Sequence, residues 1–246
     1  MALLKCEIKS HVLGLETWLN VILPYDKVRD EKPAKVLYLL HGLSDNSSAW
    51  QRYSRVESYA ANKNMAIIMP EAAKSFYTDT AYACKYFTYI TKELPKIVKS
   101  SFNISDTRED TYIAGLSMGG YGSLKCALTY PENFAMCGAF SSACDIKRIV
   151  REYSKDDAEA RRGFAGLFGS NLSVPESDDL YALAIRAKTT PELFITCGNK
   201  DFLFDDNNKF TAYLNSVGVP HTYLVWEGTH DWTFWDESIR KFIDKI

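Results

Sequence analysis

The most constraining feature of this 246-residue sequence is a serine between two glycines, in the stretch Gly115-Leu116-Ser117-Met118-Gly119. The β-prone run 112–114 precedes it and residues of helical character follow it, so a strand and a helix are expected to meet at the serine. Such a tight turn strains the serine backbone, and a Cβ at either glycine would collide with the turn. The helix would also direct its first N–H groups at the reacting centre. The pattern therefore predicts a reactive serine rather than a plain Gly/Ser-rich loop.

Composition limits the kinds of protein that this chain can be. Hydrophobic residues make up 46% and charged residues 24%, which is usual for a globular chain with a sizeable core. The net charge of −2 gives no electrostatic case for binding nucleic acid or an anionic membrane. No apolar run approaches the ~20 residues of a membrane span, and no basic and apolar leader opens the chain. A cytoplasmic protein is expected, and the sequence leaves a homo-oligomer open.

The cysteines and histidines do not suggest a metal site. The six cysteines and four histidines are scattered, without the paired spacing that zinc sites require. Most of the cysteines stand in apolar contexts and are expected to be reduced, buried thiols. We therefore expect no bound metal.

Apolar runs of strand length alternate with helical stretches along most of the chain. Strands are expected at residues 3–9, 16–23, 35–40, 65–69, 112–114, 135–140, 192–197 and 221–226. Helices are expected at 48–62, at 81–102, after the serine, at 205–217 and at the end of the chain. The first two strands should form a hairpin near Gly14, and residues 26–35 a charged surface loop. This order predicts the α/β class, with a mostly parallel central sheet and helices on both faces.

Residues 141–190 interrupt this alternation. They form a segment of about fifty residues that is rich in charge and carries helical patches but no strong strand. An insertion at the carboxyl edge of a parallel sheet is where a cap or lid would form. The alternative is a solvated helical excursion without contact to substrate. The chain is therefore expected to be one domain over residues 1–246, with a small cap at 141–190.

A reactive serine needs a base, and the base needs an acid that orients it. In the α/β-hydrolase arrangement these follow in the order serine, acid, histidine. His230 is the histidine that follows a predicted last strand downstream of Ser117, so it is the expected base. Three aspartates follow the preceding strand. Asp201 lies in the tight turn directly after that strand, whereas Asp205 and Asp206 are placed to cap the next helix, so Asp201 is the expected acid.

An acyl-transfer site also needs two N–H groups that stabilise the developing oxyanion. The N–H of Met118, directly after the serine, is one candidate. The second should come from the loop after an early strand, which here reads His41-Gly42-Leu43. The N–H of Leu43 is therefore the second expected donor.

Four stretches together resemble the Putative esterase family, over about residue 16 to the end of the chain. They are Leu39-Leu40-His41-Gly42-Leu43…Trp50, Gly115-Leu116-Ser117-Met118-Gly119-Gly120-Tyr121-Gly122, Gly198-Asn199-Lys200-Asp201 and Gly228-Thr229-His230-Asp231-Trp232…Trp235. This family includes tributyrin esterases, S-formylglutathione hydrolases (esterase D), feruloyl and acetylxylan esterases of carbohydrate esterase family 1, and mycolyltransferases. The chain is most similar to the bacterial tributyrin esterases.

The resemblance implies hydrolysis of short-chain acyl esters by the α/β-hydrolase fold without a cofactor. It implies Ser117, Asp201 and His230 as the catalytic triad, with Leu43 and Met118 as oxyanion donors. Feruloyl or acetylxylan esterase and S-formylglutathione hydrolase are alternative activities, and an acyltransferase or a non-catalytic binding protein is a more distant one. A small-molecule ester is the expected partner. Its pocket is expected to involve four aromatic residues, namely Trp50, Tyr77, Trp232 and Trp235.

Overall fold

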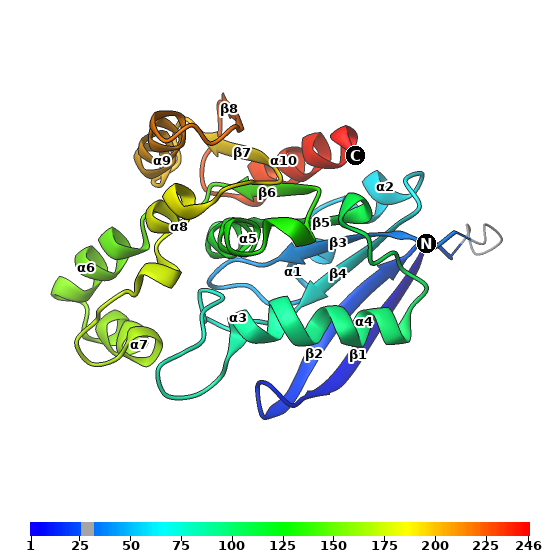
Figure 1. The fold of residues 1–246 in the computed structure, drawn as a ribbon, viewed down its shortest axis with the longest axis horizontal. Coiled ribbons are helices and arrows are strands. Elements are labelled where there is room, and N and C mark those ends of the chain that lie inside the picture. The colour runs from blue at the N-terminus through cyan, green and yellow to red at the C-terminus, as the bar shows by residue number, and fades with distance from the viewer. Residues whose placement is uncertain (26–31) are drawn as a thin grey trace.

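An eight-stranded sheet runs through the computed structural model, which describes residues 1–25 and 32–246 (Figure 1). Most of the charged loop predicted over 26–35 lies outside the described residues. The strands are β1 (Ala2–Ser10), β2 (Leu15–Leu23), β3 (Lys35–Leu40), β4 (Met65–Pro70), β5 (Thr111–Leu116), β6 (Met136–Phe140), β7 (Glu192–Gly198) and β8 (Thr222–Trp226). All eight expected strands are present, with end points shifted by a few residues at most.

The sheet is mostly parallel, as expected. Its strand order is β1-β2-β4-β3-β5-β6-β7-β8. The predicted hairpin β1–β2 is antiparallel and joins β4 in the same sense, while all pairs from β4 to β8 are parallel. The central strands β3, β4 and β5 are buried almost throughout, which explains why they are continuous apolar runs.

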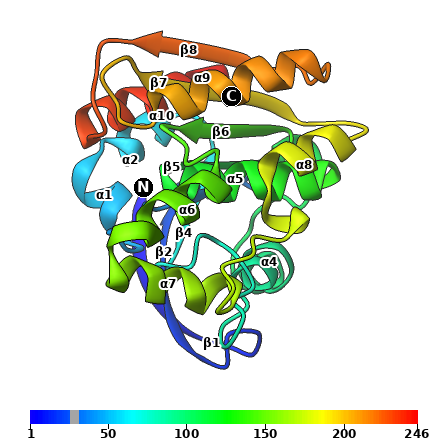
Figure 2. The ribbon, with the colours of Figure 1, turned by 90° about the vertical axis from the view of Figure 1, so that its left-hand side faces the viewer.

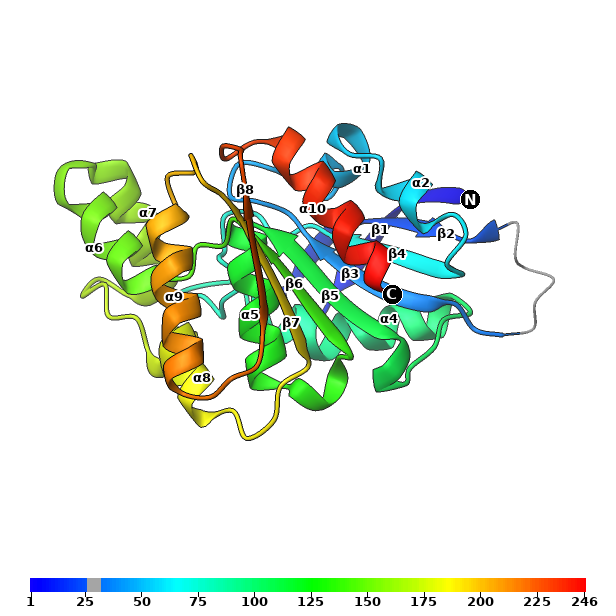
Figure 3. The ribbon, with the colours of Figure 1, turned by 90° about the horizontal axis from the view of Figure 1, so that it is seen from above.

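Helices cover both faces of this sheet (Figure 3). They are α1 (Ala49–Tyr53), α2 (Val56–Ala60), α3 (Tyr86–Thr88), α4 (Leu94–Ser101), α5 (Met118–Thr129), α6 (Ile146–Asp156), α7 (Ala158–Phe168), α8 (Leu180–Arg186), α9 (Phe204–Ser216) and α10 (Trp232–Lys245). Alternate strand residues face two separate cores. One core contains buried residues of α4, α5, α8 and α9, and the other contains those of α1, α2 and α10.

Two of the expected helices are shorter than the sequence predicted. The helix expected at 48–62 is broken after α1, because Ser54 is extended and its hydroxyl donates to the Trp50 carbonyl at 2.5 Å. The N–H of Arg55 donates instead to Asp236 of α10, at 2.8 Å.

The helix expected at 81–102 begins at Tyr86 instead. The Asp79 carboxylate accepts hydrogen bonds from both the N–H and the hydroxyl of Thr88, so residues 79–85 form a turn ahead of the helix. A π-helical turn, Tyr89–Glu93, precedes α4, and Pro95 stands in the first turn of α4. Proline has no N–H to donate back along the helix, so a change of helix type just before it is where such a residue is accommodated.

The inserted segment, residues 141–190, is helical, with α6, α7 and α8 and a 3₁₀ turn at Glu176–Asp178. Helices α6 and α7 project beyond the end of the sheet, and Figure 2, in which that end faces the viewer, shows α6 just below α5 and α7 lower still. Phe164 of α7 packs against Phe76, with ring centroids 5.9 Å apart. Arg148 of α6 forms an ion pair with Asp206 of α9. The segment is therefore anchored to the body of the protein at both α6 and α7.

Candidate active site

Ser117 stands at the turn between β5 and α5, in a strained backbone conformation. Its φ is +52° and its ψ is −114°, a combination that side-chain-bearing residues rarely adopt. Two backbone hydrogen bonds with the segment at the end of β6 hold this conformation. The Ser117 N–H donates to the Phe140 carbonyl at 2.8 Å, and the Ser117 carbonyl accepts from the N–H of Ala143 at 3.2 Å. The hydroxyl is thereby raised at the carboxyl end of the central strand.

Both glycines of this turn are required by backbone contacts. A Cβ at Gly115 would lie 2.5 Å from backbone atoms of Gly119, and a Cβ at Gly119 would lie 2.4 Å from the Leu40 carbonyl oxygen. Because these contacts are with backbone, side-chain rearrangement cannot relieve them. The prediction that a side chain at either position would collide with the turn is confirmed.

Ser117, His230 and Asp201 form a continuous hydrogen-bonded chain. The Nε2 atom of His230 lies 3.1 Å from the Ser117 hydroxyl oxygen. Its Nδ1 atom lies 3.0 and 2.9 Å from the two Asp201 carboxylate oxygens. A carboxylate only accepts, so Nδ1 carries the hydrogen and Nε2 is free to accept the serine proton. The Asp201 side chain has no exposed surface, and it also accepts the N–H of Leu203 at 2.8 Å.

The loops that carry the acid and the base are joined by backbone contacts. The N–H of Asn199 donates to the Trp226 carbonyl and that of Lys200 to the Gly228 carbonyl, each at 3.0 Å. The two loops approach so closely that a Cβ at Gly198 would lie 2.3 Å from the Gly228 oxygen. Gly198 therefore allows the turn that presents Asp201 to lie directly against the loop that presents His230.

The other two aspartates after β7 lie at the start of the next helix, as expected, but neither caps it, because the N-cap residue is Leu203. Asp205 and Asp206 lie in the first turn of α9, where carboxylates interact favourably with the helix dipole. Asp206 is paired with Arg148, away from the histidine.

The two expected oxyanion donors follow β3 and β5, which are neighbours in the sheet. Met118 is the first residue of α5, so its N–H has no partner within the helix. Leu43 is 41% exposed, and its N–H has no hydrogen-bond acceptor among residues 1–25 and 32–246. The loop is tightened by the Asp45 carboxylate, which accepts the Gly42 N–H at 3.2 Å. Burial raises the pKa of Asp45 above its usual range.

His41 supports this loop, a role that the sequence analysis did not anticipate. Its Nδ1 lies 2.8 Å from the Gly42 carbonyl, which only accepts, so Nδ1 carries the hydrogen and Nε2 accepts the Ala72 N–H at 3.0 Å. Glu71 lies 3.5 Å from the same nitrogen. The Tyr77 hydroxyl donates to the His41 carbonyl at 3.0 Å. The only sequence signal was the position of this histidine directly after a buried strand.

Three of the four aromatic residues expected in the substrate pocket, Trp50, Tyr77 and Trp235, are buried core residues. The prediction is corrected for Trp50 and Tyr77, which are also turned away from the triad. Trp50 is 1% exposed and its indole N–H donates to the Leu40 carbonyl at 2.9 Å. Tyr77 is fully buried, and its ring lies where a side chain on Gly122 would otherwise stand. Hydrogen bonds to the backbone at the end of β3 turn both rings inward. The rings therefore hold the loop 41–43, which carries the expected oxyanion donor, rather than contact substrate.

The remaining aromatic residues lie near the histidine. Trp235 is 6% exposed and meets the His230 ring edge-on, with centroids 4.9 Å apart. Trp232 is half-buried, packs on Trp235 and lines a depression of about 450 Å³. Phe202, which no sequence motif indicates, is 64% exposed, and its ring centroid lies 4.3 Å from that of His230. Phe202 thus offers apolar surface beside the triad, whereas Trp232 is connected to the histidine through Trp235, and a substrate contact at Trp232 stays a prediction.

The residues that the structure describes contain neither a metal-binding cluster nor a membrane-spanning helix. Within the described parts of the chain, no three His, Cys, Asp or Glu side chains are grouped as ligands for a metal ion. In the same parts, no helix has the length and hydrophobicity needed to cross a membrane.

Comparison with known proteins identifies the family. The model of the Putative esterase family matches residues 10–244, which is nearly the whole chain. The chain belongs to this family. The esterase is also 34% identical to an acetyl esterase of Caldicellulosiruptor saccharolyticus, over 97% of this chain and 96% of that protein.

Two solved structures from Staphylococcus aureus share both sequence and fold with this esterase. FphF, a fluorophosphonate-binding serine hydrolase, is 34% identical, with a TM-score of 0.90 over 99% of this chain and 97% of that one. The S-formylglutathione hydrolase FrmB is also 34% identical, with a TM-score of 0.87 over 99% and 98% of the two chains. The fold is therefore that of the α/β-hydrolases, and the protein is a carboxylic ester hydrolase of the serine type.

Proposed function

We propose that this esterase hydrolyses short-chain acyl esters through an acyl-serine intermediate on Ser117. The observation that carries the proposal is the unbroken hydrogen-bonded chain from the Ser117 hydroxyl through His230 to Asp201. A serine hydroxyl is a weak nucleophile at neutral pH, and this chain supplies the base that it needs.

The reaction then proceeds in two stages. In the first, Ser117 Oγ attacks the acyl carbon while His230 Nε2 takes the hydroxyl proton, and the N–H groups of Leu43 and Met118 stabilise the oxyanion. His230 returns the proton to the departing alcohol as the intermediate collapses. In the second stage, a water molecule attacks the acyl-serine while His230 takes its proton, and His230 then returns this proton to Ser117 Oγ as the carboxylic acid leaves. Asp201 orients the imidazole and stabilises its protonated form.

The similarity to an acetyl esterase supports a small acyl group as the substrate. An S-formylglutathione hydrolase activity is the second candidate, because FrmB resembles this chain over nearly its full length. Feruloyl and acetylxylan esters and the particular likeness to tributyrin esterases remain predictions from the motifs. A cytoplasmic location also remains a proposal, supported by the six cysteines, all of which are free thiols.

Removal of the nucleophile tests the proposal. We expect Ser117→Ala to lower turnover of p-nitrophenyl acetate by at least ~10³-fold. A serine-reactive phosphonate should label the native protein but not this variant. Ser216→Ala removes an exposed hydroxyl in the last turn of α9 and serves as the control, with turnover unchanged. Full turnover by Ser117→Ala would show that another residue is the nucleophile.

A substrate panel separates the candidates. The panel comprises p-nitrophenyl acetate, butyrate and octanoate, S-formylglutathione, methyl ferulate and acetylated xylan. We expect the highest kcat/KM for acetate and butyrate. A preference of more than tenfold for S-formylglutathione would favour the second candidate instead.

A further inference from the structure

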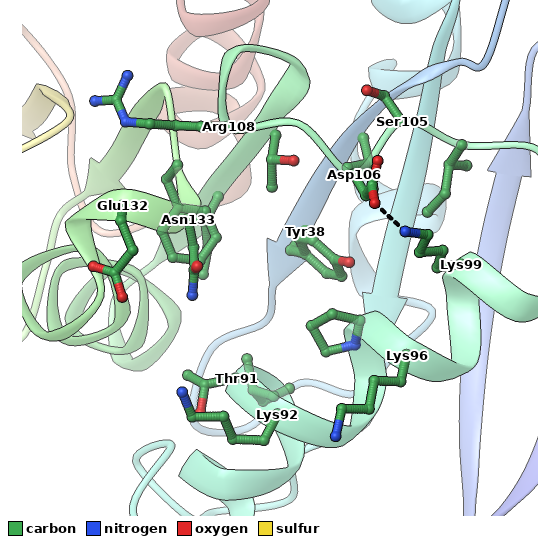
Figure 4. A pocket seen from close by; sticks show the side chains of 17 residues that line it. Tyr38, Thr91, Lys92, Lys96, Lys99, Ser105, Asp106, Arg108, Glu132 and Asn133 are labelled. Carbon is green, nitrogen blue, oxygen red and sulfur yellow. Dashed lines mark hydrogen bonds and ion pairs between the residues drawn. The ribbon is translucent and has the colours of Figure 1, made fainter.

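A second cavity lies at the opposite end of the sheet from the triad (Figure 4). It has a volume of about 380 Å³ and opens between the sheet and α4. Its walls include Val36 and Tyr38 at the start of β3 and Thr111 at the start of β5. Ser117 follows the other end of β5, roughly 20 Å away at about 3.3 Å per strand residue. The cavity is therefore separate from the catalytic site, and its volume falls within the range of small-molecule sites.

The inner surface of this cavity is mostly apolar. Ile90, Ile104, Ile113 and Phe134 contribute hydrocarbon surface. The hydroxyls of Thr91 and Thr111 also line it, but they donate to the carbonyls of Phe87 and Thr107. Tyr38 is 5% exposed, and its hydroxyl has no hydrogen-bond partner among the residues that the structure describes. Figure 4 shows the hydroxyl directed across the cavity toward the α4 side. The hydroxyl faces the solvent-filled cavity, where a ligand that accepts its hydrogen bond would take the place of water.

The Tyr38 hydroxyl is available as a donor. Burial raises its pKa well above the usual value of 10, so the phenol stays protonated throughout the physiological range. A protonated phenol can donate to a carboxylate oxygen.

The rim of the cavity is basic, with four cations against two acidic groups, Asp106 and Glu132. Three of the cations already have contacts. Lys99 pairs with Asp106, Lys92 lies over the Tyr130 ring at 3.6 Å, and Arg108 donates to the Pro131 carbonyl. Lys96 is exposed and has no ion-pair partner within 1–25 and 32–246. It is thus the cation that can pair with a bound anion.

The backbone beside the cavity is also unusual. Ile90, Thr91 and Lys92 line the cavity from within the π-helical turn Tyr89–Glu93. Such turns widen a helix locally and often occur where helices form functional sites. Here the turn presents an apolar and a charged residue to the same cavity.

We propose that this cavity binds a small organic carboxylate with an aromatic or aliphatic body. The carboxylate accepts the Tyr38 hydroxyl and pairs with Lys96, while its body lies on the isoleucines and Phe134. An inorganic anion would leave the apolar walls uncovered, and a neutral hydrocarbon would leave the hydroxyl and the ammonium group unpaired.

Calorimetry of benzoate binding tests the proposal. The protein is first blocked at the catalytic serine with a phosphonate, so that the catalytic site does not interfere. We expect benzoate to bind and benzyl alcohol and inorganic phosphate to bind at least tenfold more weakly. Crystals soaked in 4-iodobenzoate should show anomalous iodine density beside Tyr38. Iodine density only at the triad, or equal binding of benzyl alcohol, would overturn the proposal.

Variants of the two polar groups provide the second test. Lys96→Glu should raise the Kd of benzoate by about tenfold or more, because a charge-assisted contact is lost. Tyr38→Phe keeps the ring and should raise the Kd by about fivefold. Lys209→Glu makes the same charge change on the exposed surface of α9 and should leave the Kd unchanged. Ester turnover should be the same in Lys96→Glu and the native protein, and an unaltered Kd in both cavity variants would contradict the assignment.

Discussion

Gly119, two residues after the reactive serine, must be a glycine because the end of β3 lies against it. A Cβ at Gly119 would lie 2.4 Å from the Leu40 oxygen and 2.7 Å from the His41 oxygen, at the beginning of the oxyanion loop. We expect Gly119→Ala to destabilise the protein by roughly 2–3 kcal/mol, because overpacking against backbone must displace one of the two chains. It should also lower kcat, since the displaced chain carries the Leu43 N–H. Urea unfolding and p-nitrophenyl acetate turnover measure the two effects.

A glycine in an open position provides the matched control. Gly163 lies within α7, and a Cβ there would have no atom within 4 Å. Gly163→Ala should therefore stabilise the protein by about 0.5–1 kcal/mol, because it lowers the entropy of the unfolded chain without a clash. Equal effects of the two substitutions on stability would contradict this explanation of Gly119.

Local chain geometry explains which residues of the site could be predicted from the sequence. Asp201 was distinguished from Asp205 and Asp206 by its position in a turn rather than a helix, and the structure places it against the histidine. The pocket prediction is wrong for Trp50 and Tyr77 because residue type alone does not determine the direction in which an aromatic side chain turns. Hydrogen bonds to backbone carbonyls distant in the sequence decided the direction, and the sequence does not show them.

At the scale of elements, helix α5 connects the reactive serine to the inserted segment. It is buried on nearly every side and contains a buried cation, Lys125, which is 2% exposed. The ammonium group pairs with Asp178 of the inserted segment, donates to the Tyr77 carbonyl at 3.2 Å and lies 4.2 Å from the Phe87 ring centroid. This residue therefore ties α5 to two loops around the site.

We expect Lys125→Met to destabilise the protein by roughly 3 kcal/mol, because it leaves the Asp178 carboxylate buried without its partner. Lys147→Met breaks a neighbouring pair with Asp179 in which the lysine is 49% exposed. That loss should be below about 1 kcal/mol, because water screens the pair. Urea unfolding of both variants checks the difference, and similar losses would show that Lys125 contributes no more than a surface pair does.

Strands were predicted more closely than helices for a physical reason. A strand buried on both faces is a continuous apolar run, so β3 begins and ends where the sequence indicated. The helix expected from residue 81 instead begins at Tyr86, because Asp79 binds the backbone and side chain of Thr88. A contact of one carboxylate outweighs helix propensity over these few residues, and the periodicity of the sequence does not contain it.

On the scale of the whole molecule, the sheet separates two sites that the sequence did not show equally. Motifs adjacent to strand ends revealed the catalytic site, because each element contributes a characteristic short stretch. The second cavity is lined by β3, β5, α4 and the segments beside them, and none of these contributes a recognisable pattern. Only the assembled fold brings the Tyr38 hydroxyl and Lys96 to the same cavity.

The stability of the whole protein should depend on pH through Glu71, which joins the loops after β3 and β4. Burial favours the protonated form of Glu71, but the N–H groups of Ser47 and Ala73 donate to its carboxylate and hold its pKa below the usual value of 4.5. A carboxyl with a depressed pKa contributes stability above its unfolded pKa, and this contribution is lost as the pH falls toward the folded value. Between pH 6 and pH 3.5 the loss should be on the order of 1 kcal/mol. The free energy of unfolding in urea should be measured at both pH values. Its difference between them should be smaller by this amount in Glu71→Gln than in the native protein, and unchanged in the exposed variant Glu16→Gln. An unchanged pH dependence in Glu71→Gln would mean that the carboxylate adds nothing to the stability of the folded state.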